Sequence, residues 1–280
     1  MRHTAGIDIG TALTKAVIVS GGNGEAPRVL GRGMVKTGVH LEKAAAAALV
    51  EARDMARLGP RETPYVVATG FGRYSPAFRD SQVTEITSAA RGAWFLFPES
   101  STVLDIGSQS TRAIGLAANG RVRAFKTNDK CAAGSGSFIV RAAKYLQVEM
   151  AKVGDLALAA ENPQPISSIC AVLAESEIIN HVSAGVSVED ILGGIYDSLA
   201  SRAALLLKRV NLAGELTFIG GVAHQRGMVK ALQQRLQITV NVAQNCEYVC
   251  ALGAALLGLS RLEKASPAAS AATVANASSS

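Results

Sequence analysis

The stretch that decides the fold is DIGTALTKAV, at residues 8–17. An apolar run leads into Asp8, a glycine and small residues follow it, and a second apolar run continues after Lys15. β-Branched residues favour strands, and Gly10 allows the chain to turn tightly between them. The pattern therefore predicts a β-hairpin with an aspartate at the end of its first strand.

The same pattern recurs as DIGSQSTRAI, at residues 105–114. Asp105 aligns with Asp8 and Arg112 with Lys15, without any insertion between them. Two unrelated hairpins could share part of this pattern by chance. A common register from the aspartate through the basic residue favours a duplicated hairpin, one in each of two lobes.

The rest of the sequence is consistent with two α/β lobes and a tail. Apolar periodicity and breaker residues predict helices and buried strands in alternation. The main ones are a helix at 40–58, a strand at 65–70, a helix at 81–97, a helix at 191–209 and a strand at 215–219. The expected domains are a first lobe at residues 1–100, a second at 101–262, and a disordered Ala/Ser-rich tail at 263–280.

Composition narrows the class of protein. The net charge is +6, but the basic residues are scattered and form no block interleaved with aromatic residues, so nucleic-acid binding is not expected. No apolar run approaches the roughly 18–20 residues of a membrane span, and no targeting peptide is expected at the N-terminus. Four cysteines without a secretory signal indicate a reducing compartment. The sequence predicts a soluble cytoplasmic protein.

The duplicated turns suit a nucleotide. Backbone amides in each turn can bind phosphate oxygens, and Lys15 can add a positive charge. Asp8 and Asp105 can hold a hydrated Mg²⁺ from opposite sides. For either aspartate alone, a strand-end carboxylate bonded to its own turn is an equally good interpretation. Because Asp8 and Asp105 stand in matching sequence contexts, a role in Mg²⁺ binding is the favoured interpretation.

The candidate nucleotide-binding residues lie in three turns. Gly220 and Gly221 follow a buried strand, where missing side chains permit close approach of a ring such as adenine or ribose, although helix–sheet packing also produces such turns. The full set is Gly10, Thr11, Lys15, Gly107, Ser108, Gly220 and Gly221.

Two cysteines lie where helices are expected to begin. Cys131 stands in NDKCAAGSGS, residues 128–137, where Ser135 or Ser137 can cap the following helix. Cys170 stands in a second such segment, where Ser167 or Ser168 is the expected cap. Amides and the dipole at a helix N-terminus favour the thiolate, which can be a nucleophile, a redox group or a metal ligand. Neither cysteine segment contains a histidine base, which argues against a nucleophile.

The other two cysteines, Cys246 and Cys250, are four residues apart near a helix start. A second metal site is one interpretation of this spacing. The favoured interpretation is that both are small cysteines packed in the protein interior.

Together these motifs resemble a known family. The Asp8 and Asp105 hairpins with Gly220-Gly221 resemble the actin, Hsp70 and sugar-kinase ATPase fold. The segments at residues 128–136 and 166–177 are similar to signatures of the ATPases that activate 2-hydroxyacyl-CoA dehydratases and of the ATPase subunits of class I benzoyl-CoA reductase. The resemblance covers residues 5–262.

The resemblance implies a cofactor and partners. In that family a dimer holds one [4Fe–4S] cluster with two cysteines from each subunit, and Cys131 and Cys170 fall on those positions. ATP, Mg²⁺, a related ATPase subunit, catalytic reductase subunits and a ferredoxin-like electron donor are implied as well. Asp8 and Asp105 would be catalytic together with Gln109, which would orient the attacking water, because phosphoryl transfer depends mainly on positioning.

The family allows more than one function. The leading expectation is the ATPase and electron-transfer subunit of a benzoyl-CoA reductase, an enzyme of anaerobic aromatic degradation. CAVLAE at residues 170–175 and ARGA at 90–93 favour it over a homodimeric dehydratase activator. Activators usually carry an aspartate where this chain has Ser110, so either a Mg²⁺ contact or a water-positioning group is missing. Glu175 is a weak nucleotide-site candidate. A small-molecule kinase without a cluster, or a non-catalytic ATP-binding module, are the alternatives of another class.

Overall fold

The computed structural model of the chain describes residues 2–22, 24–129, 135–167 and 170–265. The chain divides into two compact units. The first unit comprises Met1–Gly92 together with Tyr248–Ser280, and the second comprises Ala93–Glu247. Each unit is described by itself below.

The first unit is built on a five-stranded mixed sheet with the order β3-β2-β1-β4-β5. β1 pairs antiparallel with β2, and β2 with β3, whereas β1 and β4, and β4 and β5, are parallel. The strands are β1 (Arg2–Ile9), β2 (Leu13–Gly22), β3 (Glu25–Lys36), β4 (Tyr65–Thr69) and β5 (Ser81–Gln82).

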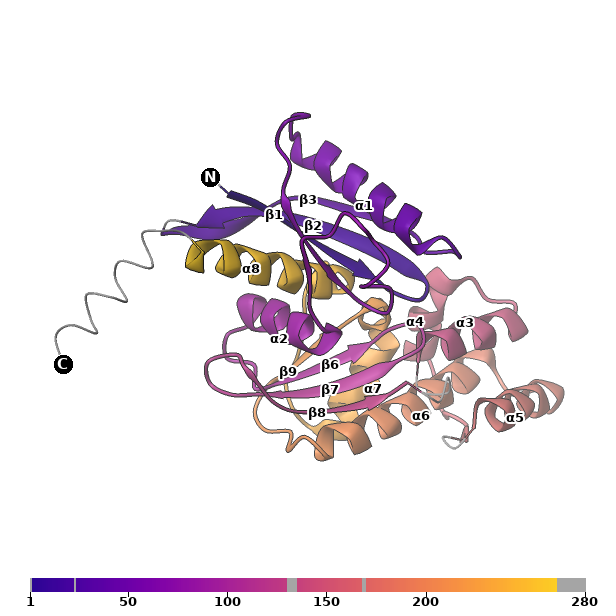
Figure 1. Ribbon diagram of the computed structural model, residues 1–280. Coiled ribbons are helices and arrows are strands. Elements are labelled where there is room, and N and C mark those ends of the chain that lie inside the picture. The colour runs from indigo at the N-terminus through magenta and orange to yellow at the C-terminus, as the bar shows by residue number, and fades with distance from the viewer. Residues whose placement is uncertain (1, 23, 130–134, 168–169, 266–280) are drawn as a thin grey trace. The chain divides into compact units, whose positions relative to one another are not determined.

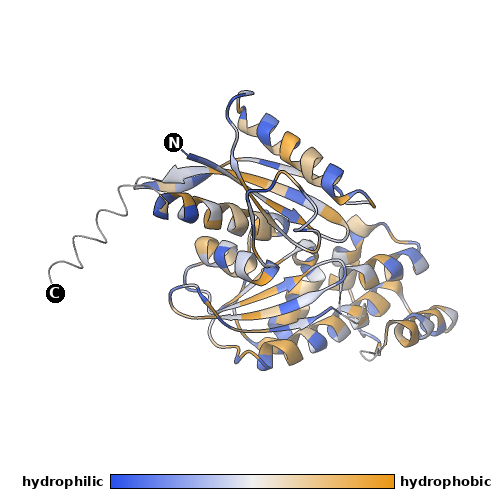
Figure 2. Ribbon diagram, viewed as in Figure 1, coloured by the Kyte–Doolittle hydropathy of each residue, from blue (hydrophilic) through white to orange (hydrophobic). Residues whose placement is uncertain are grey.

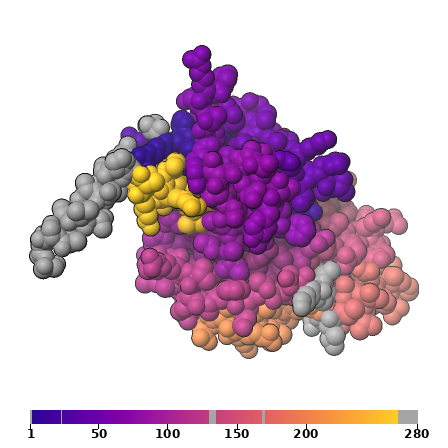
Figure 3. Space-filling model, viewed as in Figure 1, coloured from indigo at the N-terminus to yellow at the C-terminus, as the bar shows by residue number. Residues whose placement is uncertain are grey.

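Helices cover this sheet on both faces (Figure 1). α1 (Leu41–Ala56) is amphipathic, as the mixture of hydrophobic and hydrophilic residues in Figure 2 shows, and it buries four alanines. α8 (Val249–Lys264) packs on β1, β2 and β4. Its approach to β1 is close, because a Cβ at Gly6 would collide with the Ala251 carbonyl oxygen. In Figure 3 the yellow surface of this helix adjoins the indigo surface of the N-terminal strand.

The position of α8 differs from the expected division at residue 100. Residues 101–262 were expected to form one lobe, whereas α8 packs on the sheet formed by the start of the chain. The boundary between the units falls within α2 (Glu85–Leu96). α8 continues to Lys264, so the first residues of the expected tail are helical, and residues 266–280 lie outside the described chain.

The second unit repeats the sheet of the first. Its order is β10-β9-β6-β7-β8, with β6, β7 and β8 antiparallel and β6, β9 and β10 parallel. The strands are β6 (Thr102–Ile106), β7 (Thr111–Leu116), β8 (Val122–Asn128), β9 (Leu216–Ile219) and β10 (Val240–Val242). The duplicated hairpin is thus confirmed, and it extends to a duplicated five-stranded sheet.

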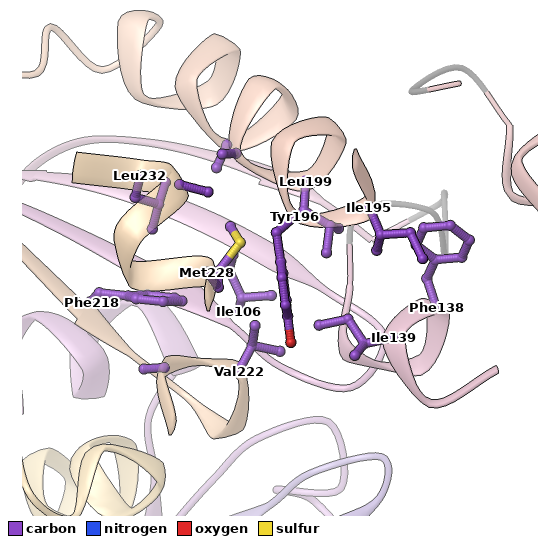
Figure 4. Packing of buried hydrophobic residues seen from close by; sticks show 14 of the residues in the cluster. Ile106, Phe138, Ile139, Ile195, Tyr196, Leu199, Phe218, Val222, Met228 and Leu232 are labelled. Carbon is purple, nitrogen blue, oxygen red and sulfur yellow. The ribbon is translucent and has the colours of Figure 1, made fainter. Parts of the chain in front are cut away.

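Helices of the second unit enclose one large apolar core. They are α3 (Gly136–Tyr145), α4 (Met150–Leu158), α5 (Ala171–Ser183), α6 (Val188–Lys208) and α7 (Arg226–Leu236), with short 3₁₀ turns η2 (Gly221–His224) and η3 (Cys246–Tyr248). Tyr196 stands in the middle of this core (Figure 4) and donates its hydroxyl proton to Gln225 Oε1 at 2.9 Å. Burial raises the pKa of Tyr196 above its ordinary value.

Most expected elements are confirmed, with two differences at their ends. Residues 81–82 form the short strand β5 rather than the start of a helix, and α2 begins at Glu85. α6 begins at Val188 rather than at residue 191. Its N-cap is Ser187, whose hydroxyl accepts a hydrogen bond from the Asp190 amide. Among the described residues, no helix has both the length and the apolarity needed to cross a membrane.

Candidate nucleotide site and iron ligand

The first expected turn holds an ion pair. Asp8 is buried near the end of β1, directly opposite Lys15 on β2, and Lys15 Nζ lies 2.7 Å from Asp8 Oδ2. The Gly10 amide donates to the Leu13 carbonyl at 3.2 Å and closes a tight turn. Thr11 lies inside this turn and is exposed. The turn therefore presents a cation, a carboxylate and an exposed stretch of backbone in one place.

The second turn repeats this geometry. Asp105 is buried on β6, opposite Arg112 on β7, and Arg112 Nη1 lies 2.9 Å from Asp105 Oδ2. The Gly107 amide donates to the Ser110 carbonyl at 2.9 Å. Within this turn Ser108 is half-buried and Gln109 is exposed. An exposed glutamine in a closed turn is available to a ligand, as its expected role requires.

A glycine packs against each aspartate from the next parallel strand. Gly70, after β4, has φ +90°, and a Cβ there would come within 2.5 Å of Asp8 Oδ1. Gly220, after β9, has φ +88°, and a Cβ would come within 2.6 Å of Asp105 Oδ1. Gly221, in contrast, has open space where a side chain would project. The missing side chain at Gly220 therefore leaves room for the Asp105 carboxylate, and its contact with a nucleotide stays a prediction.

The two turns differ in what holds them. In the first, the Thr37 hydroxyl donates to the Gly10 carbonyl at 2.8 Å, so the end of β3 fixes the turn. In the second, the amides of Gly136 and Ser137 donate to the carbonyls of Gly107 and Ser108 at 2.9 and 2.8 Å. The N-terminus of α3 is therefore bonded directly to the second turn.

α3 is also bonded to α5. Arg141 Nε lies 2.6 Å from Glu175 Oε1, and the Tyr145 hydroxyl donates to Glu175 Oε2 at 3.2 Å. Glu175 thus joins two helices, a role different from the nucleotide contact considered for it. Sequence reasoning missed Arg141, because the two partners are far apart in the chain and share no pattern.

Cys170 lies at the N-cap of α5, half-buried, with a free thiol. Ser167 is not the N-cap residue that was expected, because Cys170 occupies that position. The Ser167 amide donates to Glu177 Oε2 at 2.5 Å. Ser135 is the N-cap of α3 but makes no capping bond with its side chain; its hydroxyl lies 3.2 Å from that of Ser137. Cys131 and Ser168 lie outside the described residues.

The structure places the expected nucleotide residues in two groups. Asp8, Gly10, Thr11 and Lys15 lie together in the first unit, and Asp105, Gly107, Ser108, Gln109, Gly220 and Gly221 in the second. Arg112 and Gly70 belong to the same geometry but were not expected site residues. The repeat signalled both, since Arg112 aligns with Lys15, and Gly70 follows a buried strand as Gly220 does.

This fold is that of a known family of ATPases. Residues 5–258 match the BadF/BadG/BcrA/BcrD ATPase family, and the chain belongs to it. It is 38% identical to the 2-hydroxyisocaproyl-CoA dehydratase activator of Clostridioides difficile, over 91% of this chain and 94% of that protein. It is 39% identical to one of the subunits of benzoyl-CoA reductase from Thauera aromatica, over 94% of this chain and 95% of that one.

Solved structures of other proteins share this fold. The activator of the 2-hydroxyisocaproyl-CoA dehydratase from Clostridium difficile, with bound ADPNP, superposes with a TM-score of 0.86 at 34% identity, covering 94% of this chain and 96% of that one. A glucokinase of the ROK family from Streptomyces griseus shares the fold alone, with a TM-score of 0.56 at 16% identity over 91% and 98% of the two chains. The expected α/β ATPase fold is confirmed.

Proposed function

We propose that this chain is an ATP-hydrolysing electron-transfer subunit. It passes low-potential electrons from a [4Fe–4S] cluster, shared with a second ATPase subunit, to the catalytic subunits of a CoA-ester reductase of the benzoyl-CoA type. The observation that carries the proposal is the chain of contacts from the Gly107–Ser108 turn through α3 to α5, the helix that begins after Cys170.

The two turns supply what an ATPase needs from its own residues. Buried Asp8 in the first unit and buried Asp105 in the second are each a carboxylate that could contact a hydrated Mg²⁺. Lys15 holds its ammonium beside the first turn, 3.4 Å from where a Gly10 Cβ would lie. Lysine has three donors, so Lys15 can keep its bond to Asp8 while it binds a phosphate oxygen. The turn that contains Gly107 and Ser108 would bind phosphate oxygens in the second unit.

Gln109 positions the attacking water. Its side chain is exposed in a turn closed by the Gly107–Ser110 hydrogen bond, so it is presented from a fixed backbone. Ser110 uses its carbonyl to close that turn, and its hydroxyl is the polar group that replaces the family's usual carboxylate there. We expect slower hydrolysis than in a chain with aspartate at this position.

The surroundings of Cys170 fit an iron ligand at a subunit interface. A cluster with Cys₄ ligation performs one-electron transfer, and two cysteines from each of two chains complete it. The Cys170 thiol is half-buried at a helix N-cap, where amide dipoles stabilise negative charge. The nearby residues Val172 and Leu173 are 68% and 52% exposed, which suits a surface that a second subunit covers.

The contacts suggest how hydrolysis reaches the cysteine. A change in the Gly107–Ser108 turn on loss of a phosphate moves the N-terminus of α3, because the two are joined by two backbone hydrogen bonds. α3 transmits the movement to α5 through the Arg141–Glu175 ion pair. A shift of the α5 N-terminus changes the field at Cys170, and with it the reduction potential of the bound cluster.

A homodimeric activator of a 2-hydroxyacyl-CoA dehydratase is the nearest alternative. The identities to an activator and to a benzoyl-CoA reductase subunit are 38% and 39%, so they do not separate the two partners. Purification of the chain together with its native neighbours, followed by assay with an aromatic and with a 2-hydroxyacyl CoA ester, decides between them. Reduction of the aromatic ester supports the leading proposal, and dehydration of the hydroxyacyl ester supports the alternative.

Anoxic purification with measurement of iron and sulfide tests the cluster. The wild-type protein is expected to be coloured and to hold about four irons per pair of chains. Cys131→Ser and Cys170→Ser are each expected to lose the iron while still binding nucleotide, and Cys250→Ser serves as the matched control. A colourless, iron-free wild type would refute the cluster and would favour a small-molecule kinase of the same fold.

A further inference from the structure

Three metal-ligating side chains meet in the second unit, beside the Gly220-Gly221 turn and outside the Cys170 helix. His224 ends η2, and Cys246 and Glu247 begin η3. One ligand atom from each of the three lies within 4.8 Å of the others. His224 Nε2 and Glu247 Oε2 are 2.5 Å apart.

The three donors run from the interior to the surface. Cys246 is 1% exposed, the Glu247 side chain is 14% exposed and the His224 side chain is 48% exposed. A buried sulfur beneath a solvent-accessible imidazole gives an ion both an anchor and a route of entry. An ordinary surface ion pair would need only the histidine and the carboxylate.

The backbone already holds the two segments together. The Gly220 amide donates to the Cys246 carbonyl at 3.1 Å, and the Ala223 amide donates to the Gly220 carbonyl at 3.1 Å. The turn that carries His224 and the turn that carries Cys246 are thus joined before any ligand binds. Only small side-chain movements separate the present spacing from that of ligands around one ion.

The charges also suit a divalent cation. A bound dication compensates a thiolate and a carboxylate together, and the thiol proton leaves to solvent as the metal–sulfur bond forms. The geometry of the three donors is what defines the site.

We propose that His224, Cys246 and Glu247 bind a divalent transition-metal ion of the Zn²⁺ type, with water in a fourth position. Nitrogen, sulfur and oxygen donors in one site favour Zn²⁺ over Mg²⁺ or Ca²⁺, which prefer oxygen ligands alone. The site uses none of the cysteines assigned to the cluster. Its occupation therefore does not depend on the proposed cluster.

The test uses the full-length chain with Cys131→Ser and Cys170→Ser, so that neither cluster cysteine can bind added metal. After removal of metal by a chelator, Zn²⁺ is titrated against a chromophoric competitor, and Co²⁺ is added to a second sample. We expect about one Zn²⁺ per chain and a near-ultraviolet thiolate-to-Co²⁺ charge-transfer band. Cys250→Ser is the matched control, a neighbouring buried cysteine outside the trio, and should keep both signals.

Removal of each ligand provides the specific readout. Cys246→Ser should abolish the Co²⁺ charge-transfer band, and His224→Gln and Glu247→Gln should each weaken Zn²⁺ binding by at least ~10–100-fold. The last two residues are less buried, so their variants keep the test valid if Cys246→Ser does not fold. Absence of Zn²⁺ binding in the parent, or unchanged affinity in both His224→Gln and Glu247→Gln, would overturn the proposal whatever the iron content of the wild type.

Discussion

The two sheets of this protein share a plan and differ in one attachment. Each has the same strand order, a buried aspartate paired with a basic residue across a hairpin, and a positive-φ glycine against that aspartate. The first turn is fixed by Thr37 of its own sheet, whereas the second is bonded to α3. The second turn is thus bonded directly to a helix, whereas the first is bonded to a residue beside its own sheet.

The two turns share the groups for nucleotide binding, but only the second has the described connection to α3 and α5. Both turns carry the groups that a Mg²⁺–polyphosphate needs, so both should matter for hydrolysis. The second is joined in addition, through a helix, to Glu175 and to the helix that follows Cys170.

The largest effect is expected from the paired aspartates. Asp8→Asn and Asp105→Asn should each slow ATP hydrolysis by ~100–1000-fold, the magnitude typical of losing one group that stabilises developing charge. Steady-state phosphate release measures it. Asp155→Asn, a change in an exposed ion pair, is the control. A loss below about tenfold in either variant would show that the two turns are not functionally equivalent.

Substitution of either paired glycine, Gly70 or Gly220, should destabilise the protein to a similar extent. Gly70→Ala and Gly220→Ala each place a Cβ against an aspartate oxygen and strain a positive-φ backbone, so each should lower the free energy of unfolding by about 2 kcal/mol or more. Gly24→Ala has nearly the same φ, +89°, but open space around it, and should cost about 1 kcal/mol. Chemical denaturation measures all three. An equal cost in all three variants would mean that the aspartate contacts add nothing.

Breaking the link from the second turn to α5 should change the response of the cluster potential to nucleotide more than it changes the free energy of unfolding. Glu175→Gln weakens a partly exposed ion pair and should cost at most about 1 kcal/mol. It should also reduce the difference in cluster potential between the ADP-bound and ATP-bound forms, because α3 then moves without α5. Glu149→Gln, in an ion pair at the surface of the same unit, is the control. A full nucleotide response in Glu175→Gln would remove this ion pair from the proposed route.

The smallest effect is expected at the start of α6. The Asn162 amide, followed by the Ser187 hydroxyl, lowers the pKa of Asp190 below its ordinary value of 3.8. Its contribution to stability is therefore present above about pH 4 and is lost as the pH falls through the lower, folded-state pKa. Asp190→Asn should make the acid limb of the stability profile shallower, without altering the nucleotide response. A response altered as much as in Glu175→Gln would show that the route through α3 is not specific.

Much of this arrangement could be predicted from the sequence because it repeats. The aspartate, glycine and basic residue recur in one register, and that register is what pairs Asp8 with Lys15 and Asp105 with Arg112. The helix start at Cys170 was also expected, although the cysteine itself, not a serine, occupies the N-cap. Local sequence patterns of this kind predict strand register and helix starts directly.

The remainder depends on contacts between distant segments. Arg141 and Glu175 come together because two helices pack, and His224 meets Cys246 because two strand ends lie side by side. Neither pair has a spacing that a sequence pattern could reveal. α8 joins the first sheet for a similar reason, since its small residues need a close-packed strand, and Gly6 supplies one.

The central claim is that nucleotide state changes the environment of a cluster held by Cys131 and Cys170. Its most direct test is a redox titration of the anoxic wild-type protein, followed by electron paramagnetic resonance, with ADP and with a non-hydrolysable ATP analogue. The account predicts two different cluster potentials. One potential, unchanged between the two nucleotides, would contradict it.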